Sequence, residues 1–306
     1  MSVQSARVIA VVVASLAAAC AVRPEGPSSD QGQAVASASL PIFESVLTYA
    51  GYDSTTGQCT KTQHMLVFRP VAPGRYPVMT YTVGTGGIYD APEGRTVASE
   101  MAKRGFVAAS IEYDSLDPAV LLSYAPIYGA ASCAYAKTES TSAIGTLCSL
   151  SDADCSRGVV TGGMSQGADL AILAQSYDSD VRAAWVMGFG KISIWGETLS
   201  WVLPQDRLRI VDGTEQDPAD LEAITGCTST TQSCFQSNGS GWYIVQDSEL
   251  ESGQSGHCYY IAPRTDGTPV GCTNYPPNGF DPGWAPPSTL PWSLDTNLAW
   301  LASFTN

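Results

Sequence analysis

Two patterns of apolar residues alternate along most of this chain. Short apolar runs, many of them β-branched, predict buried strands over residues 65–71, 76–83, 106–113, 159–161, 181–189, 208–211 and 242–246. Apolar residues three or four positions apart predict helices over residues 94–104, 138–150, 168–177 and 294–304. Since strands that alternate with helices form mostly parallel sheets, we expect an α/β fold whose central sheet is covered by helices on both faces.

The first 39 residues depart from these patterns. Arg7 precedes an apolar run over residues 8–19 that is too short to span a membrane, so residues 1–19 are interpreted as a signal peptide. The run ends in Leu-Ala-Ala-Ala-Cys at Cys20, which resembles the lipobox of bacterial lipoproteins, and ordinary signal-peptidase cleavage is the alternative. Residues 20–39 are rich in Pro, Gly, Ser and Gln and are interpreted as a lipid-anchored flexible tether, leaving one folded domain over residues 40–306.

Composition and charge limit the partners. With 44% hydrophobic residues, the 306-residue chain has enough apolar surface for a substantial core. Its net charge of -14 repels phosphate backbones and anionic lipid headgroups. We therefore expect no nucleic-acid partner, and contact with a membrane only through a lipid on Cys20.

The cysteines favour disulfides in an exported protein. Apart from Cys20 there are eight, an even number: Cys59, Cys133, Cys148, Cys155, Cys227, Cys234, Cys258 and Cys272. Three pairs are close in sequence and flank turn-rich loops, namely 148 with 155, 227 with 234 and 258 with 272, which leaves 59 and 133. No Cys-x-x-Cys occurs and the chain has two histidines, so no metal site is expected. A cell-envelope lipoprotein or a secreted protein, stapled by disulfides, is the predicted context.

Ser165 is the candidate nucleophile. It lies between Gly163 and Gly167, directly after the strand predicted over residues 159–161 and before the helix predicted over residues 168–177. Glycines two positions on either side let a strand and a helix approach closely, so the serine can occupy a strained turn with its hydroxyl above the sheet. An ordinary glycine-rich loop is the alternative interpretation.

The order of elements resembles the α/β-hydrolase family from residue 40 to the end. That order is strand, glycine cluster, helix, strand, Gly-x-Ser-x-Gly, strand, acidic loop, strand, histidine and helix. The resemblance implies a nucleophile, an acid and a histidine base in this sequence order, hence Ser165, an acid within residues 212–217 and His257. His64 precedes the first core strand, outside the family order, and is interpreted as an exposed or capping histidine.

The acid is the least determined member of this set. The family often has it three residues after a glycine, but the residue three positions after Gly213 is Gln216. The loop is then one residue longer, giving Asp217, or it uses Glu215, with Asp212 as a third alternative. Asp217 is preferred, although an Asp before a proline also suits the N-cap of a helix.

The resemblance implies acyl transfer without a metal or organic cofactor. His257 takes the Ser165 proton, Ser165 attacks a carbonyl, and backbone N–H groups of Gln166 and Thr85, the latter in the glycine cluster at residues 84–87, hold the oxyanion. The expected reaction is hydrolysis of a small or polymeric carboxylic ester. Alternatives are a lipase or polyester depolymerase, a serine peptidase of the same fold, and a surface-tethered binding protein that has lost activity.

Two loop regions are expected to border an open site. Residues 114–137 look irregular and residues 263–291 are dense in Pro, Gly and Asn, and neither has the sustained periodicity of a lid helix. Aromatic residues in or near these regions are candidates for substrate contact, with packing at the domain edge as the alternative. They are Tyr124, Tyr259, Trp284 and Trp292.

Overall fold

The computed structural model describes residues 39–115, 123–189, 193–194, 197–262, 272 and 279–305. By its contacts the chain divides into Met1–Ser37 and Ala38–Asn306, and every described residue belongs to the second unit. The predicted signal peptide, Cys20 and nearly all of the predicted tether therefore lie outside the described residues. None of the described helices is long and apolar enough to cross a membrane.

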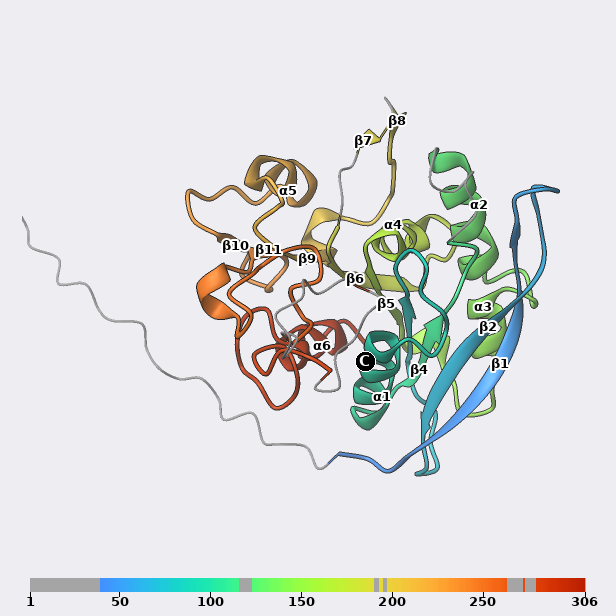
Figure 1. The fold of residues 1–306 in the computed structure, drawn as a ribbon. Helices are drawn as coiled ribbons and strands as arrows, with labels where there is room; N and C mark the ends of the chain where they lie inside the picture. The colour runs from blue at the N-terminus through green and yellow to red at the C-terminus, as the bar shows by residue number, and fades with distance from the viewer. Residues whose placement is uncertain are drawn as a thin grey trace, which may run out of the picture. The chain divides into compact units, whose positions relative to one another are not determined.

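A nine-stranded mixed sheet forms the centre of the domain (Figure 1). Its strands, in spatial order, are β1 (Ile42–Asp53), β2 (Gln58–Pro70), β4 (Val107–Ile111), β3 (Val78–Thr82), β5 (Val159–Met164), β6 (Val181–Met187), β9 (Leu208–Asp212), β11 (Gly241–Ile244) and β10 (Ser233–Phe235). Neighbouring strands pair in parallel from β4 to β11, whereas the pairs at the two ends of the sheet are antiparallel. A short antiparallel pair, β7 (Ser193–Ile194) and β8 (Glu197–Thr198), is separate from this sheet.

Helices cover both faces of the sheet. They are α1 (Pro92–Lys103), α2 (Tyr124–Tyr135), α3 (Ala143–Cys148), α4 (Gln166–Leu173), α5 (Pro218–Thr225) and α6 (Leu294–Ala302). The crossovers from β3 to β4 and from β5 to β6 run in opposite directions along the sheet. Because such crossovers are right-handed, α1 and α4 lie on opposite faces. An ion pair between Arg104, the residue directly after α1, and Asp295 connects this end of α1 to α6, while α2 contacts both α3 and α4.

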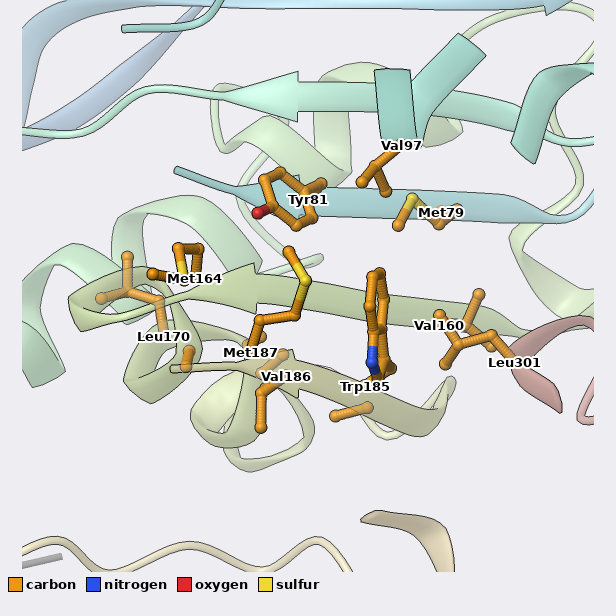
Figure 2. Packing of buried hydrophobic residues seen from close by; sticks show 14 of the residues in the cluster. Met79, Tyr81, Val97, Val160, Met164, Leu170, Trp185, Val186, Met187 and Leu301 are labelled. Carbon is orange, nitrogen blue, oxygen red and sulfur yellow. The ribbon is translucent and has the colours of Figure 1, made fainter. Parts of the chain in front are cut away.

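The core lies where the apolar runs predicted it. Strands β3, β4 and β5 are buried along their whole length, as parallel strands covered on both faces must be. Figure 2 shows Met79 of β3, Val160 of β5 and Trp185 of β6 in one buried cluster, which α4 joins through Leu170 and α6 through Leu301. The predicted α/β organisation of sheet and helices is therefore confirmed.

Four disulfides cross-link the domain, in the pairs predicted from sequence spacing. Three close short loops: Cys148–Cys155, Cys227–Cys234 and Cys258–Cys272. The fourth, Cys59–Cys133, joins β2 to α2 across 74 residues of sequence. The eight cysteines other than Cys20 are thus all paired.

The expectation for residues 114–137 is wrong. Residues 114–137 were predicted to be irregular, yet α2 occupies Tyr124–Tyr135. This helix is buried on most of its circumference, so its sequence has no polar face that would reveal a period of 3.6 residues. Ser123 marks its start, because the Ser123 side chain accepts a hydrogen bond from the N–H of Ala125.

Candidate active site

Ser165 occupies a strained turn between β5 and α4. Its φ is 55° and its ψ is -126°, and among the described residues it is the one non-glycine residue with positive φ. Such a conformation costs about 1–3 kcal/mol and persists where the surroundings hold it in place. Here the Ser165 N–H donates to the Met187 carbonyl at 2.9 Å, and its carbonyl accepts from the Ala168 N–H at 2.8 Å.

The two flanking glycines allow this turn. A Cβ on Gly167 would lie 2.2 Å from the carbonyl oxygen of Thr82, and a Cβ on Gly163 would lie 2.2 Å from the carbonyl oxygen of Gly167. Both contacts are with backbone, which cannot move aside cheaply. The strand, turn and helix predicted around Ser165 are therefore present, with glycine required by close approach at both positions.

A cavity of about 410 Å³ adjoins Ser165 at the carboxyl ends of the parallel strands. Binding sites in open α/β sheets occur at this edge. Its described lining comes from the loop after β3, the start of α1, the turn before α4 and the segment that follows β11. The lining residues are Gly84, Thr85, Gly86, Gly87, Ile88, Asp90, Ala91, Pro92, Glu93, Met164, Ser165, His257, Tyr260 and Cys272. The structure thus brings Ser165, His257 and Thr85 to one cavity.

Glu215 is the carboxylate that pairs with His257. The distance from His257 Nδ1 to Glu215 Oε1 is 3.0 Å, and the two side chains are 36% and 49% exposed. Asp217, the acid preferred from the sequence, is used elsewhere: its Oδ1 accepts from the Ala219 N–H at 2.9 Å and caps α5. Among the described carboxylates, only Glu215 lies within ion-pairing distance of His257.

Backbone packing between two loops sets this pairing. The N–H and the Oγ1 of Thr214 both donate to the Ser255 carbonyl, at 2.8 and 2.7 Å. A Cβ on Gly213 would lie 2.4 Å from the Gly256 carbonyl oxygen, so the loops touch along their backbones. This contact places residue 215 opposite His257, and it was not visible in the sequence. One sequence signal pointed away from Asp217. It is followed by a proline, a pair typical of a helix start, where the Asp carboxylate is used as the N-cap.

Asp212, the third candidate acid, is buried at the end of β9. Burial raises its pKa well above the ordinary range, and the negative charge of Glu215 raises it further. Its carboxyl accepts a hydrogen bond from the Phe189 N–H, which links β9 to the segment after β6. Asp212 is therefore buried beside Glu215 and forms no ion pair with His257 among the described residues.

The glycine cluster after β3 forms a turn in which the N–H groups of Gly84 and Thr85 donate to none of the described residues. The Gly87 N–H donates to the Gly84 carbonyl at 2.9 Å, and Gly86 has a φ of 76°, which favours glycine. The Gly86 N–H is taken by Ser115 Oγ at 3.0 Å, whereas the Thr85 N–H donates to none of the described residues. Gln166 begins α4, where the first backbone N–H groups lack an acceptor within the helix.

The aromatic residues proposed for substrate contact lie in the core instead. Tyr124, Tyr259, Trp284 and Trp292 are all buried, and none lines the described cavity. Tyr259 packs edge-on against Trp292, with ring centroids 6.0 Å apart. Tyr260, which was not among the predicted contact residues, lines the cavity. Residues 263–271 and 273–278, which belong to the region predicted to border the site, lie outside the described residues.

No group of three or more potential metal ligands is found among the described side chains. No family model matches the chain, and no curated protein matches it. Solved structures that match part of the chain include a hypothetical protein from Pseudomonas aeruginosa (16% identity, TM-score 0.38), the esterase Est22 (15%, 0.36) and a bacterial heroin esterase (16%, 0.38). The matches cover 51%, 51% and 56% of this chain and 46%, 47% and 66% of those structures. The chain thus spans about half to two thirds of their length.

Proposed function

We propose that this protein is a serine hydrolase of the α/β-hydrolase fold that cleaves carboxylic esters. One observation supports the proposal most: Ser165 occupies a strained strand-to-helix turn and faces the same cavity as His257, which is paired with Glu215. Strain of this kind clusters at functional sites, and a serine, histidine and carboxylate brought together from separate loops match the requirements of nucleophilic catalysis.

Each residue has a defined role in the proposed reaction. His257 accepts the Ser165 hydroxyl proton as the Ser165 oxygen attacks the ester carbonyl, and it then gives this proton to the leaving alcohol. Glu215, through His257 Nδ1, orients the imidazole and stabilises its charged form. Water activated by His257 hydrolyses the resulting acyl-enzyme and regenerates Ser165.

Two backbone groups are proposed to stabilise the oxyanion. The Thr85 N–H is supported by its lack of a described acceptor and by its place on the cavity wall. The Gln166 N–H is supported by its position at the start of α4, directly after Ser165. No metal or organic cofactor takes part in these steps.

The substrate class follows from the cavity. At about 410 Å³ it suits the acyl or alcohol part of a small ester, or one unit of a polymeric ester. Its described lining includes the apolar side chains of Ile88, Ala91 and Met164. We propose further that the protein works outside the cytoplasm, because four disulfides are typical of an oxidising compartment. Anchoring through a lipid on Cys20 is part of this proposal.

Hydrolysis of p-nitrophenyl acetate and butyrate tests the proposed function. The full chain should hydrolyse both esters, and Ser165→Ala should reduce the rate by at least about 10³-fold. Ser149→Ala is the matched control, because the Ser149 hydroxyl is bonded to the Thr146 carbonyl at the end of α3 and lies outside the cavity lining. Equal activity in Ser165→Ala and the control would disprove the proposal, and a folded but inert wild type would favour a binding protein.

A further inference from the structure

The segment after β4, residues Glu112–Ser115, contacts both sides of the proposed oxyanion hole. One side is the start of α4, which carries Gln166, and the other is the loop between β3 and α1, which carries Thr85. These two elements are about 80 residues apart in sequence. An oxyanion hole needs its donors within about 2.7–3.1 Å of the developing charge, so their relative placement must be fixed by something that touches both.

Tyr113 connects this segment to α4. Its hydroxyl donates to Oε1 of Gln166 at 3.0 Å, and its side chain is 5% exposed. Burial raises the pKa of Tyr113 well above its ordinary value, so the hydroxyl stays protonated and keeps its hydrogen to donate. Tyr113 therefore restrains the side chain of the residue whose backbone N–H is proposed to face the oxyanion.

Three hydrogen bonds connect the last residue of β4 and the segment Glu112–Ser115 to the chain around Thr85. The Val83 N–H donates to the Ile111 carbonyl at 3.4 Å. The Gly86 N–H donates to Ser115 Oγ at 3.0 Å, and the Tyr89 N–H donates to Glu112 Oε2 at 3.3 Å. Ser115 is 3% exposed, so its bond to Gly86 is shielded from water. These bonds lie on both sides of Thr85 in the sequence, and Thr85 itself lines the cavity.

His64 holds the Glu112 carboxylate in place. Glu112 Oε1 accepts the His64 backbone N–H at 2.8 Å and lies 2.7 Å from His64 Nδ1. The Glu112 backbone is tied in as well, since its N–H donates to the His64 carbonyl at 3.2 Å and its carbonyl accepts from the Tyr49 hydroxyl at 2.7 Å. His64, which lies outside the family order of catalytic residues, thus has a specific partner near the cavity loop.

We propose that Glu112, Tyr113 and Ser115 are positioning residues that hold the two donors of the oxyanion hole at a fixed separation. This inference rests on the proposed ester hydrolysis and adds to it a structural element that none of the catalytic side chains supplies. The segment touches Gln166 and the residues beside Thr85, and its own end is fixed to β2 through His64. Losing one of these bonds lets a donor shift by tenths of an ångström, which weakens stabilisation of the transition state more than binding of the substrate.

The test compares Tyr113→Phe and Ser115→Ala with a matched control in the full chain. The control is Tyr76→Phe, which also removes one hydroxyl bond, from Tyr76 to the Ala72 carbonyl, outside the described cavity lining. Each variant is assayed with p-nitrophenyl butyrate and with its thionoester, in which sulfur replaces the carbonyl oxygen. Sulfur is a weak hydrogen-bond acceptor, so the thionoester gains little from an oxyanion hole.

The positioning role predicts a specific pattern. In both variants kcat for the oxyester falls about 5- to 50-fold, part of the 10²- to 10³-fold lost when a donor is removed outright, with KM nearly unchanged. The thionoester rate falls much less, and the control changes neither. Equal losses on both substrates, or no loss on either, would overturn the inference while leaving ester hydrolysis intact. A wild type that hydrolyses neither substrate would overturn both proposals.

Discussion

Two substitutions with opposite expected effects test whether Glu215, and not Asp217, is the carboxylate that acts with His257. Glu215→Gln keeps the shape of the side chain and removes the charge 3.0 Å from His257 Nδ1. Asp217→Ala removes the carboxylate that accepts the Ala219 N–H at the start of α5. The first variant should lose activity and keep its stability, and the second should lose stability and keep its activity.

The expected loss for Glu215→Gln follows from the geometry. Two unit charges 3.0 Å apart attract by about 1.4 kcal/mol at a dielectric constant of 80 and about 5.5 kcal/mol at 20. Because both side chains are one third to one half exposed, screening by water favours the lower part of this range, about 2–3 kcal/mol. This corresponds to a loss in kcat of about 10²-fold, less than the 10⁴-fold typical of a triad with a buried acid.

The expected loss for Asp217→Ala is that of an exposed N-cap. Removing such a cap costs about 1 kcal/mol of unfolding free energy, or about 2–4 °C in Tm for a domain of this size. The assay is kcat and KM for p-nitrophenyl butyrate together with a thermal melt of each variant. A large fall in kcat for Asp217→Ala, with Glu215→Gln close to wild type, would refute the assignment and restore the acid preferred from the sequence.

Three further substitutions probe the surroundings of the site. Gly167→Ala should cost roughly 3 kcal/mol or more, because its Cβ would lie 2.2 Å from the Thr82 carbonyl oxygen, and urea unfolding measures this loss. Burial raises the pKa of Asp169 to about 8, whereas the unfolded chain releases this proton near pH 4. Because the folded state keeps the proton, stability falls as the pH rises from about 4 to about 8. Asp169→Asn should therefore stabilise the protein at pH 8 and change little at pH 4, and an equal effect at both pH values would contradict burial. The double variant Cys258→Ser and Cys272→Ser should lower kcat more than the double variant Cys148→Ser and Cys155→Ser does, because the Cys258–Cys272 disulfide adjoins His257.

The central strands and the turn at Ser165 were predictable because local sequence determines them. An apolar run such as residues 159–161 must be buried on both faces wherever it lies in the sheet, and the close approach at Gly163 and Gly167 allows no side chain. Ser165, the acidic loop and His257 likewise follow three successive strands of the chain, β5, β9 and β11, so their order could be predicted with that of the strands. The four disulfide pairs followed from spacing and an even count.

The carboxylate that pairs with His257 and the cavity wall were not predictable because tertiary contacts determine them. The hydrogen bonds of Thr214 to Ser255 decide which acidic residue faces His257, and Thr214 and Ser255 are 41 positions apart in the sequence. Likewise, the sequence showed two adjacent tyrosines without indicating that Tyr259 packs inward against Trp292 while Tyr260 lines the cavity. Helix α2 escaped detection for the opposite reason, since burial on most of its surface removed the polar face that periodicity needs.

Covalent labelling by a fluorophosphonate probe, followed by peptide mass mapping, tests the central claim most directly. Such probes react with a serine only where a base and an oxyanion hole activate it. The account predicts one modified peptide, containing Ser165, in the native full chain, and no labelling in Ser165→Ala or in heat-denatured protein. A folded chain that stays unlabelled, or that is labelled equally in Ser165→Ala, would contradict the account.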